Sequence, residues 1–185
     1  QSLLVQLYPE TTTALQFETP FQLAIATILS AQCTDKRVNL VTPVLFARFP
    51  DAAALAHADM EEIQKLIQST GFFRAKARNI QACAQKILDQ HAGKLPETLE
   101  ELIALPGIGR KTANVVLGDA FGVPGITVDT HVGRLSRRLA LSVHTDPVKV
   151  EKDLMRWIPQ GEWTRFSHRL IFHGRQVCHA RKPLC

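Results

Sequence analysis

Two helical patterns joined by a very short glycine-containing turn place the strongest constraint on how this sequence can fold. Apolar residues recur at helical spacing over residues 99–105, and Pro106 ends this pattern because it lacks an N–H and its ring clashes with the preceding turn. A second helical pattern begins at Arg110, so only residues 107–109 remain to turn the chain. Both glycines in this segment can adopt positive φ and let a ligand approach closely. The stretch therefore predicts a helix, a tight turn and a second helix.

The start of the second helix is suited to binding an anion. Unpaired backbone N–H groups and the positive end of the helix dipole meet at such a position. Arg110 and Lys111 lie in this first turn, where the dipole favours acidic side chains instead. Two cations there are unfavourable for the helix and are explained if a phosphate binds. The alternative is a bare helical corner with a solvated surface lysine.

The rest of the sequence favours an all-α protein, because no convincing run of alternating apolar and polar residues occurs. Thr19 and Pro20 are typical of a helix start, and the mostly apolar segment after them predicts a central helix. Residues 72–91 predict one long helix. Pro43 should kink or restart the helix in which it lies.

Composition sets wide bounds. The 185 residues, of which 45% are hydrophobic, suffice for one large domain or two small lobes with a proper core. The net charge of +5 suits an anionic partner such as DNA without proving one. No apolar run approaches membrane-spanning length and no secretory leader is visible, so we expect a soluble intracellular protein. The chain begins at Gln1 and stops at Cys185, and we expect both ends to be cut.

The Leu-Pro-Gly-Ile-Gly-Arg-Lys-Thr-Ala segment at 105–113 resembles the helix–hairpin–helix motif of the DNA glycosylase superfamily. Val-Asp-Thr-His-Val at 128–132 resembles the acidic segment that follows this motif. The whole pattern is most similar to the endonuclease III family, from about residue 20 to the last residue. The resemblance implies a two-lobed helical fold with a DNA groove between the lobes. A six-helix lobe would span residues 13–123, and residues 1–12 and 124–185 would form the second lobe.

The resemblance also implies an activity. Members of this family are bifunctional enzymes that remove oxidised pyrimidines from duplex DNA and cleave the strand at the abasic site. Lys111 would form a Schiff base with the deoxyribose, and Asp129 would assist base loss and proton transfer. The segment between Lys111 and Asp129 is long enough to return beside the start of the lysine helix. A plain helix N-cap is the alternative role for Asp129.

Further residues match positions that contact DNA in the family. The glutamine of the 29–35 segment would enter the gap left by the flipped base, and Phe72 takes the place of an apolar wedge that is often leucine. A core aromatic is the alternative for Phe72. We expect some of the basic residues Arg74, Lys76 and Arg78 to contact DNA phosphates. The alternative is that all three are solvated surface charges. The implied DNA contacts are Gln32, Phe72, Gly107, Gly109, Arg110, Arg181 and Lys182, and the implied pocket residues are Ser30, Asp35 and His131.

The four cysteines fall into two pairs. Cys33 and Cys83 lie in apolar helical patterns and are expected to be buried thiols. Cys178 and Cys185 lie in a basic tail and match the first two ligands of the family's C-x6-C-x2-C-x5-C loop, which holds a [4Fe–4S] cluster. Four thiolates hold such a cluster, so we expect the intact protein to continue with two more. A zinc site that includes a neighbouring histidine is the alternative.

Other functions remain as alternatives. A non-catalytic helix–hairpin–helix module would bind DNA, but it would need neither Lys111 nor Asp129. Adenine-specific mismatch glycosylases lack the hairpin lysine and carry an early glutamate, whereas residues 21–29 contain no acid. An 8-oxoguanine glycosylase would share the lysine and the aspartate but not the cysteine tail. We expect a monomer that binds double-stranded DNA containing damaged bases or abasic sites in the bacterial cytoplasm, associated with the nucleoid and with no membrane.

Overall fold

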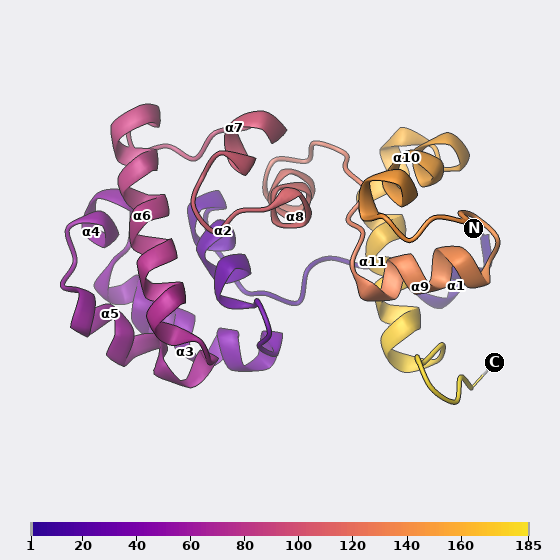
Figure 1. Cartoon of the computed structure of the whole chain (residues 1–185), viewed down its shortest axis with the longest axis horizontal. Helices are drawn as coiled ribbons and strands as arrows, with labels where there is room; N and C mark the ends of the chain where they lie inside the picture. The colour runs from indigo at the N-terminus through magenta and orange to yellow at the C-terminus, as the bar shows by residue number, and fades with distance from the viewer. Residues whose placement is uncertain (1, 185) are drawn as a thin grey trace. The chain divides into compact units, whose positions relative to one another are not determined.

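The computed structural model describes residues 2–184, and every regular element in this range is helical (Figure 1). The all-α prediction is therefore confirmed. The α-helices are α1 (Ser2–Leu7), α2 (Pro20–Leu29), α3 (Asp35–Arg48), α4 (Ala52–Ala56), α5 (Met60–Ile67), α6 (Phe73–His91), α7 (Leu99–Ile103), α8 (Arg110–Ala120), α9 (Thr130–Arg138), α10 (Pro147–Trp157) and α11 (Trp163–Gln176), and the 3₁₀ helices are η1 (Gln68–Thr70) and η2 (Gln160–Glu162). None of the helices described is long and apolar enough to cross a bilayer.

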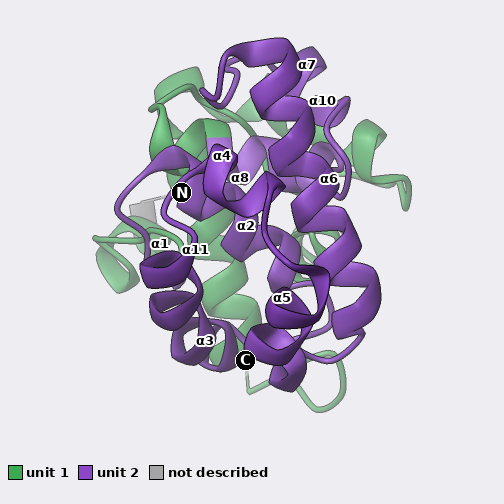
Figure 2. Ribbon diagram, turned by 90° about the vertical axis from the view of Figure 1, so that its left-hand side faces the viewer, with its two compact units in different colours: residues 1–13, 117–185 green, residues 14–116 purple. Residues whose placement is uncertain are grey.

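The chain divides into two compact units, which Figure 2 distinguishes by colour. Unit 2 contains residues 14–116. Unit 1 combines the segment that ends at Thr13 with the chain from Leu117 onward, so both ends of the sequence contribute to it. The sequence-based boundary lies after residue 123, whereas this division falls within α8.

Helix α2 is central to the core of unit 2. Its start follows the pattern expected from the sequence, since the Thr19 side chain accepts a hydrogen bond from the Gln22 N–H and Pro20 occupies the first helical position. A sequence that is apolar on most faces suits a helix surrounded by others. Its buried residues are Phe21, Leu23, Ala24, Ile25, Ala26, Thr27, Ile28 and Leu29.

Helix α3 runs from Asp35 to Arg48 with Pro43 inside it, so the expected restart does not occur. Proline cannot donate to the carbonyl of Asn39 one turn earlier, which weakens the helix at this point. Four residues on one side of the helix around Pro43 are nevertheless buried and hold the helix in place, because burial of apolar surface offsets a lost hydrogen bond. These buried neighbours are Val41, Thr42, Leu45 and Phe46.

Unit 1 has its own apolar core, formed mainly by α9, α10 and α11. Its buried members are Ile126, Val132, Leu135, Val150, Leu154, Ile158, Phe166, Leu170 and Cys178. A polar contact inside unit 1 joins the end of α8 to α11, since His168 Nε2 lies 2.9 Å from Asp119 Oδ2 and both side chains are buried. Apolar packing and a buried polar pair therefore both stabilise unit 1.

Candidate active site and nucleic-acid interface

The predicted hairpin turn lies between α7 and α8. The Ile108 N–H donates to the Leu105 carbonyl at 3.1 Å, and both side chains are buried. Gly107 has a φ of +79°, and a Cβ at this position would lie 3.1 Å from Asn79 Cβ. Glycine at 107 is therefore required by backbone conformation and by space.

The start of α8 is open and cationic. The Gly109 carbonyl accepts the Ala113 N–H at 2.9 Å, which makes Gly109 the residue that precedes the helix. A Cβ on Gly109 would meet no described atom within 4 Å, so another molecule can approach its backbone. Arg110 and Lys111 occupy the first turn of α8 and are exposed. First-turn N–H groups lack partners within the helix, so this turn combines N–H donors, dipole and charge that favour a phosphate.

Asp129 begins α9 as its N-cap. Its Oδ1 accepts the N–H groups of His131 and Val132, each at 2.8 Å. The capping role that the sequence left open is thus present, and it uses Oδ1 without involving Oδ2. The side chain is half-buried, so part of the carboxylate remains accessible.

His131, a predicted pocket residue, packs inside unit 1. Its Nδ1 lies 3.1 Å from Arg134 Nη2. A Cβ at Gly174 of α11 would lie only 2.9 Å from the same ring, so a glycine there allows the imidazole to fit. The structure gives His131 a packing role against α11, and its part in a base pocket stays a prediction.

Gln32 and Phe72 both have left-handed backbones. Their φ angles are +52° and +47°, a region that bulky L-residues rarely adopt. Gln32 is exposed, and Phe72 leaves 68% of its surface exposed directly before α6. The alternative that Phe72 is a core aromatic is therefore wrong. Strained, exposed side chains of this kind are a feature of functional sites.

The other two predicted pocket residues flank Gln32. Ser30 is the C-cap of α2, and its hydroxyl donates to the Thr27 carbonyl at 2.8 Å. Asp35 is the first residue of α3, and Thr34 caps that helix. Ser30 and Gln32 thus belong to one short connection between two helices, and Asp35 lies directly after it.

The expectation for the basic residues of α6 is partly wrong. Arg74 and Arg78 are exposed, as phosphate contacts or solvated cations would be, but Lys76 is buried. Lys76 Nζ donates to the carbonyls of Leu29 and Thr70 at 2.8 and 2.7 Å. Lys76 therefore cannot reach a phosphate from this position. Helical spacing was the missed signal, because Lys76 lies one turn before the buried Ile80.

Cys178 begins a compact loop at the C-terminal end of the described chain. Its sulfur is buried and accepts an N–H from Arg138 Nη1 at 3.0 Å. The Leu184 N–H donates to the Val177 carbonyl at 3.0 Å, which closes the loop. Arg181 and Lys182 are exposed on it. Cys185, the second predicted ligand, lies outside the described residues.

The cysteines differ in their suitability as metal ligands. Burial raises the pKa of the Cys83 thiol to about 12, so it stays protonated at neutral pH and is a poor ligand. Cys33 is only half-buried and lies between α2 and α3, which corrects the expectation of a buried helical thiol. Cys178 fits a thiolate ligand better, since a cationic N–H donor suits a negative sulfur. Within residues 2–184 no three His, Cys, Asp or Glu side chains gather into a metal site.

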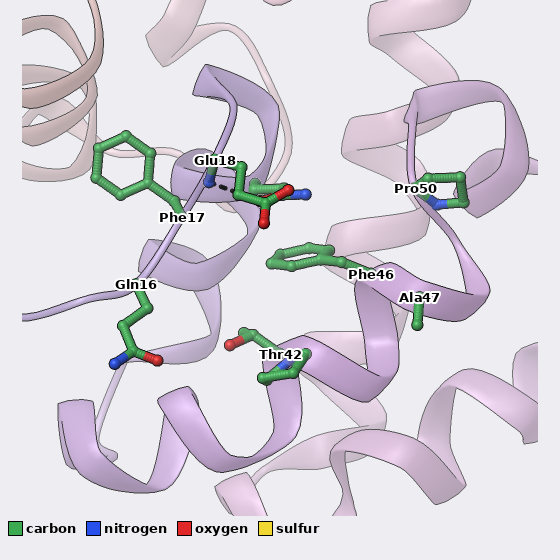
Figure 3. Close-up of a pocket in the computed structure, with 9 residues that line it drawn as sticks. Gln16, Phe17, Glu18, Thr42, Phe46, Ala47 and Pro50 are labelled. Atoms are coloured by element: carbon green, nitrogen blue, oxygen red, sulfur yellow. Dashed lines mark hydrogen bonds between the residues drawn. The ribbon is translucent and has the colours of Figure 1, made fainter.

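A pocket of about 490 Å³ in unit 2 contains none of the predicted site residues (Figure 3). At its edge the Glu18 N–H donates to Gln22 Oε1 at 2.8 Å. The lining residues are Gln16, Phe17, Glu18, Gln22, Thr42, Pro43, Phe46, Ala47 and Pro50. The predicted chemistry is therefore not built around this pocket.

Comparison with known proteins identifies the family. Residues 25–160 match the HhH-GPD superfamily of base excision DNA repair proteins. The chain is 60% identical over 184 residues to endonuclease III of Synechocystis sp., covering 99% of this chain and 84% of the relative. It is 46% identical to endonuclease III of Bacillus subtilis, covering 97% of this chain and 82% of the relative.

Solved structures that resemble this chain point to the same family. A trapped endonuclease III–DNA covalent intermediate matches with a TM-score of 0.95 and 45% identity over 100% of this chain and 87% of the other. A thermostable thymine-DNA glycosylase matches with a TM-score of 0.87, 20% identity and coverages of 99% and 86%, which supports the fold alone. The chain therefore belongs to the endonuclease III family of the HhH-GPD base excision DNA repair proteins, and it is a DNA glycosylase and AP lyase.

Proposed function

We propose that this enzyme removes oxidised pyrimidines from duplex DNA, with Lys111 as the nucleophile and Asp129 as the assisting carboxylate. The observation that carries the proposal is the place of Lys111, exposed in the first turn of α8 directly after the open Gly109. The substrate is double-stranded DNA that carries damaged bases or abasic sites. The active species is a single chain in the bacterial cytoplasm.

Binding comes before chemistry. The N–H groups at the start of α8 and the Arg110 side chain hold a phosphate, and Gly107 and Gly109 let the DNA backbone come close. Gln32 and Phe72 fill the space that the flipped nucleotide leaves in the duplex. Flipping costs a few kcal/mol and least for a damaged pair, so it favours lesions over normal bases. Ser30, Asp35 and His131 would line the pocket that receives the base.

The proposed reaction begins with the Lys111 amine placed beside the deoxyribose of the damaged nucleotide. Neutral Lys111 Nζ attacks C1′, and the bond from C1′ to the base breaks with its electron pair going to the base, which takes up a proton. The C1′–O4′ bond then breaks and opens the sugar ring: the nitrogen loses one proton, O4′ gains one, and Lys111 is left as a protonated imine on C1′. The imine makes a C2′ proton acidic, and loss of this proton expels the 3′ phosphate by β-elimination. Asp129 stabilises the cationic sugar and moves protons during these steps. Water then releases Lys111 from the product.

We propose that Cys178 and Cys185 supply two of four thiolates for a [4Fe–4S] cluster. When bound, the cluster supplies a structural cross-link. The loop it closes would present Arg181 and Lys182 to DNA phosphates. Iron analysis of the full-length protein should find iron, and zinc or no metal would contradict this assignment.

Borohydride trapping tests the catalytic proposal. Reduction during turnover should join the enzyme covalently to a duplex with one oxidised pyrimidine, and peptide mapping should place the bond on Lys111. Lys111→Gln should abolish trapping and strand cleavage while DNA affinity stays within about threefold, because one exposed amine changes. Lys65→Gln, a change at another exposed lysine of unit 2, should trap normally. Normal trapping in Lys111→Gln would mean that another amine is the nucleophile.

A further inference from the structure

The two short segments that carry Gln32 and Phe72 share an unusual backbone. We call residues 30–33 the Gln32 loop and residues 70–72 the Phe72 loop. Each contains a non-glycine residue with positive φ, and in each that residue is the one proposed to enter the duplex. Left-handed residues persist where the surrounding structure holds them in place. The backbone of each loop therefore needs support from neighbouring groups.

Lys76 is such a group. Leu29 is the last residue of α2 and directly precedes the Gln32 loop. Thr70 is the last residue of η1 and the first residue of the Phe72 loop. Lys76 Nζ donates to the carbonyls of both residues, at 2.8 and 2.7 Å. The two carbonyl oxygens can therefore lie no further apart than the sum of these distances. The Lys76 backbone N–H also donates to the Phe72 carbonyl at 3.0 Å, which adds a third bond to the same region.

The chemistry of an ammonium group suits this task. The last carbonyls of a helix lack partners within it and lie at the negative end of its dipole, which attracts a cation. Lys76 is only 4% exposed, and burial lowers its pKa while the neighbouring Cys33 opposes this effect. Burying a cation is costly unless its hydrogen bonds are good, and without the ammonium group the Leu29 and Thr70 carbonyls would each lose a buried donor. One ammonium group therefore serves a carbonyl beside each of the two loops.

We propose that Lys76 is a positioning residue that joins the Gln32 loop and the Phe72 loop into one rigid element, so that both side chains reach the duplex at a fixed separation. This inference rests on the proposed insertion roles of Gln32 and Phe72. Groups held in place before binding lose less conformational entropy when they bind, and this increases affinity for the distorted duplex.

Hydrogen exchange of the DNA-free protein provides the first test. Lys76→Met keeps the length and apolar stem of the side chain and removes its N–H donors. Amides of residues 30–33 and 70–73 should exchange at least about tenfold faster than in the wild type. Lys86→Met is the matched control, because Lys86 lies on the same helix and donates to the Ala104 carbonyl at 2.9 Å. It should leave exchange in both loops unchanged. Unchanged exchange in Lys76→Met would overturn the proposal.

A double-mutant cycle provides the second test and separates positioning from general stability. Lys76→Met should weaken binding to a duplex with an uncleavable abasic analogue about tenfold and change binding to undamaged duplex by less than about twofold. In a protein that already carries Gln32→Ala and Phe72→Ala, adding Lys76→Met should weaken binding to the abasic duplex hardly any further. A full tenfold loss in that background would show a merely structural lysine and overturn the proposal.

Failure of the proposed insertion roles has a different signature. If alanine at positions 32 and 72 leaves abasic binding unchanged while Lys76→Met still accelerates exchange, the link between the loops stands and the insertion roles are overturned. Should Lys76→Met not fold, Lys76→Gln takes its place in both tests. Glutamine keeps two N–H donors on a shorter side chain, and its effects should be intermediate.

Discussion

A single carboxylate can serve the fold and the reaction at once. Asp129 caps α9 through Oδ1, and the proposed chemistry needs the negative charge that both oxygens share. Asparagine caps helices about as well as aspartate, but it carries no charge and cannot take up a proton. The two roles can therefore be separated by one substitution.

We expect Asp129→Asn to slow base removal by at least about 100-fold, the usual contribution of a proton-transferring group. The free energy of unfolding should fall by less than about 1 kcal/mol, since only the interaction with the helix dipole is lost. Single-turnover base release and thermal unfolding measure the two effects. Asp146→Asn is the matched control, because Asp146 caps α10 by accepting the Lys149 N–H. A similar loss of activity in both variants would mean that capping, not chemistry, explains the effect.

Lys76 shows where residue-level reading of the sequence fails. Alternation with Arg74 and Arg78 favours a solvated basic run, yet the helical period places Lys76 on the side of Ala77 and Ile80, which are buried. Its two carbonyl partners come from segments that no local pattern connects to α6. The helical period thus predicts the burial of Lys76, whereas its hydrogen-bond partners are predictable only when tertiary contacts are known.

At the scale of helices and turns, local signals predict most of unit 2. The N-cap of α2 and the hairpin before α8 follow from residue types at fixed spacing. Pro43 shows the limit of such signals, because burial of its neighbours keeps α3 continuous. The left-handed Phe72 could not be predicted either, since phenylalanine has no preference for that conformation. The helices and turns are thus predictable where capping residues set their ends. They are not predictable where tertiary packing sets the backbone conformation.

The tail after α11 is held by two arginines of α9 that the sequence analysis missed. Arg134 and Arg138 are four residues apart, so they lie on one face of the helix. Arg134 Nη2 donates to the carbonyls of Gly174 and Cys178, at 2.9 and 2.8 Å. Arg138 donates to the Cys178 sulfur and to the carbonyls of His179 and Ala180, at 3.0, 2.7 and 3.0 Å. The start of the cysteine loop is therefore positioned by α9.

We expect Arg138→Gln to loosen this loop without unfolding unit 1. Three hydrogen bonds from an exposed guanidinium are lost, and local opening should become easier by roughly 1–2 kcal/mol. Trypsin should then cleave between residues 175 and 182 about tenfold faster, as followed by mass spectrometry. Arg137→Gln removes an exposed arginine from the same last turn and should cleave at the wild-type rate. Equal rates in all three proteins would mean that Arg138 does not hold the loop.

At the scale of the whole chain, unit 1 depends on segments from opposite ends of the sequence. The Arg169 side chain is buried and its Nε donates to the Tyr8 carbonyl at 3.2 Å. Tyr8 also places its hydroxyl 3.3 Å from His173 Nδ1, and Leu4 packs against the core of the unit. Hydrophobic periodicity contains no information on such distant pairs. The two-lobed arrangement was therefore expected from family resemblance rather than from spacing.

Deleting residues 1–8 tests this dependence on the N-terminal segment. We expect the free energy of unfolding of unit 1 to fall by about 2–4 kcal/mol, because Arg169 keeps its burial while losing a carbonyl partner and the core loses the side chain of Leu4. Two transitions should then separate in a thermal scan, with unit 1 melting first. Leu7→Ala is the control, since Leu7 lies on the same helix and is 63% exposed, and it should change stability by less than about 0.5 kcal/mol. A truncated protein that melts like the wild type would show that α11 and its neighbours need no support from α1.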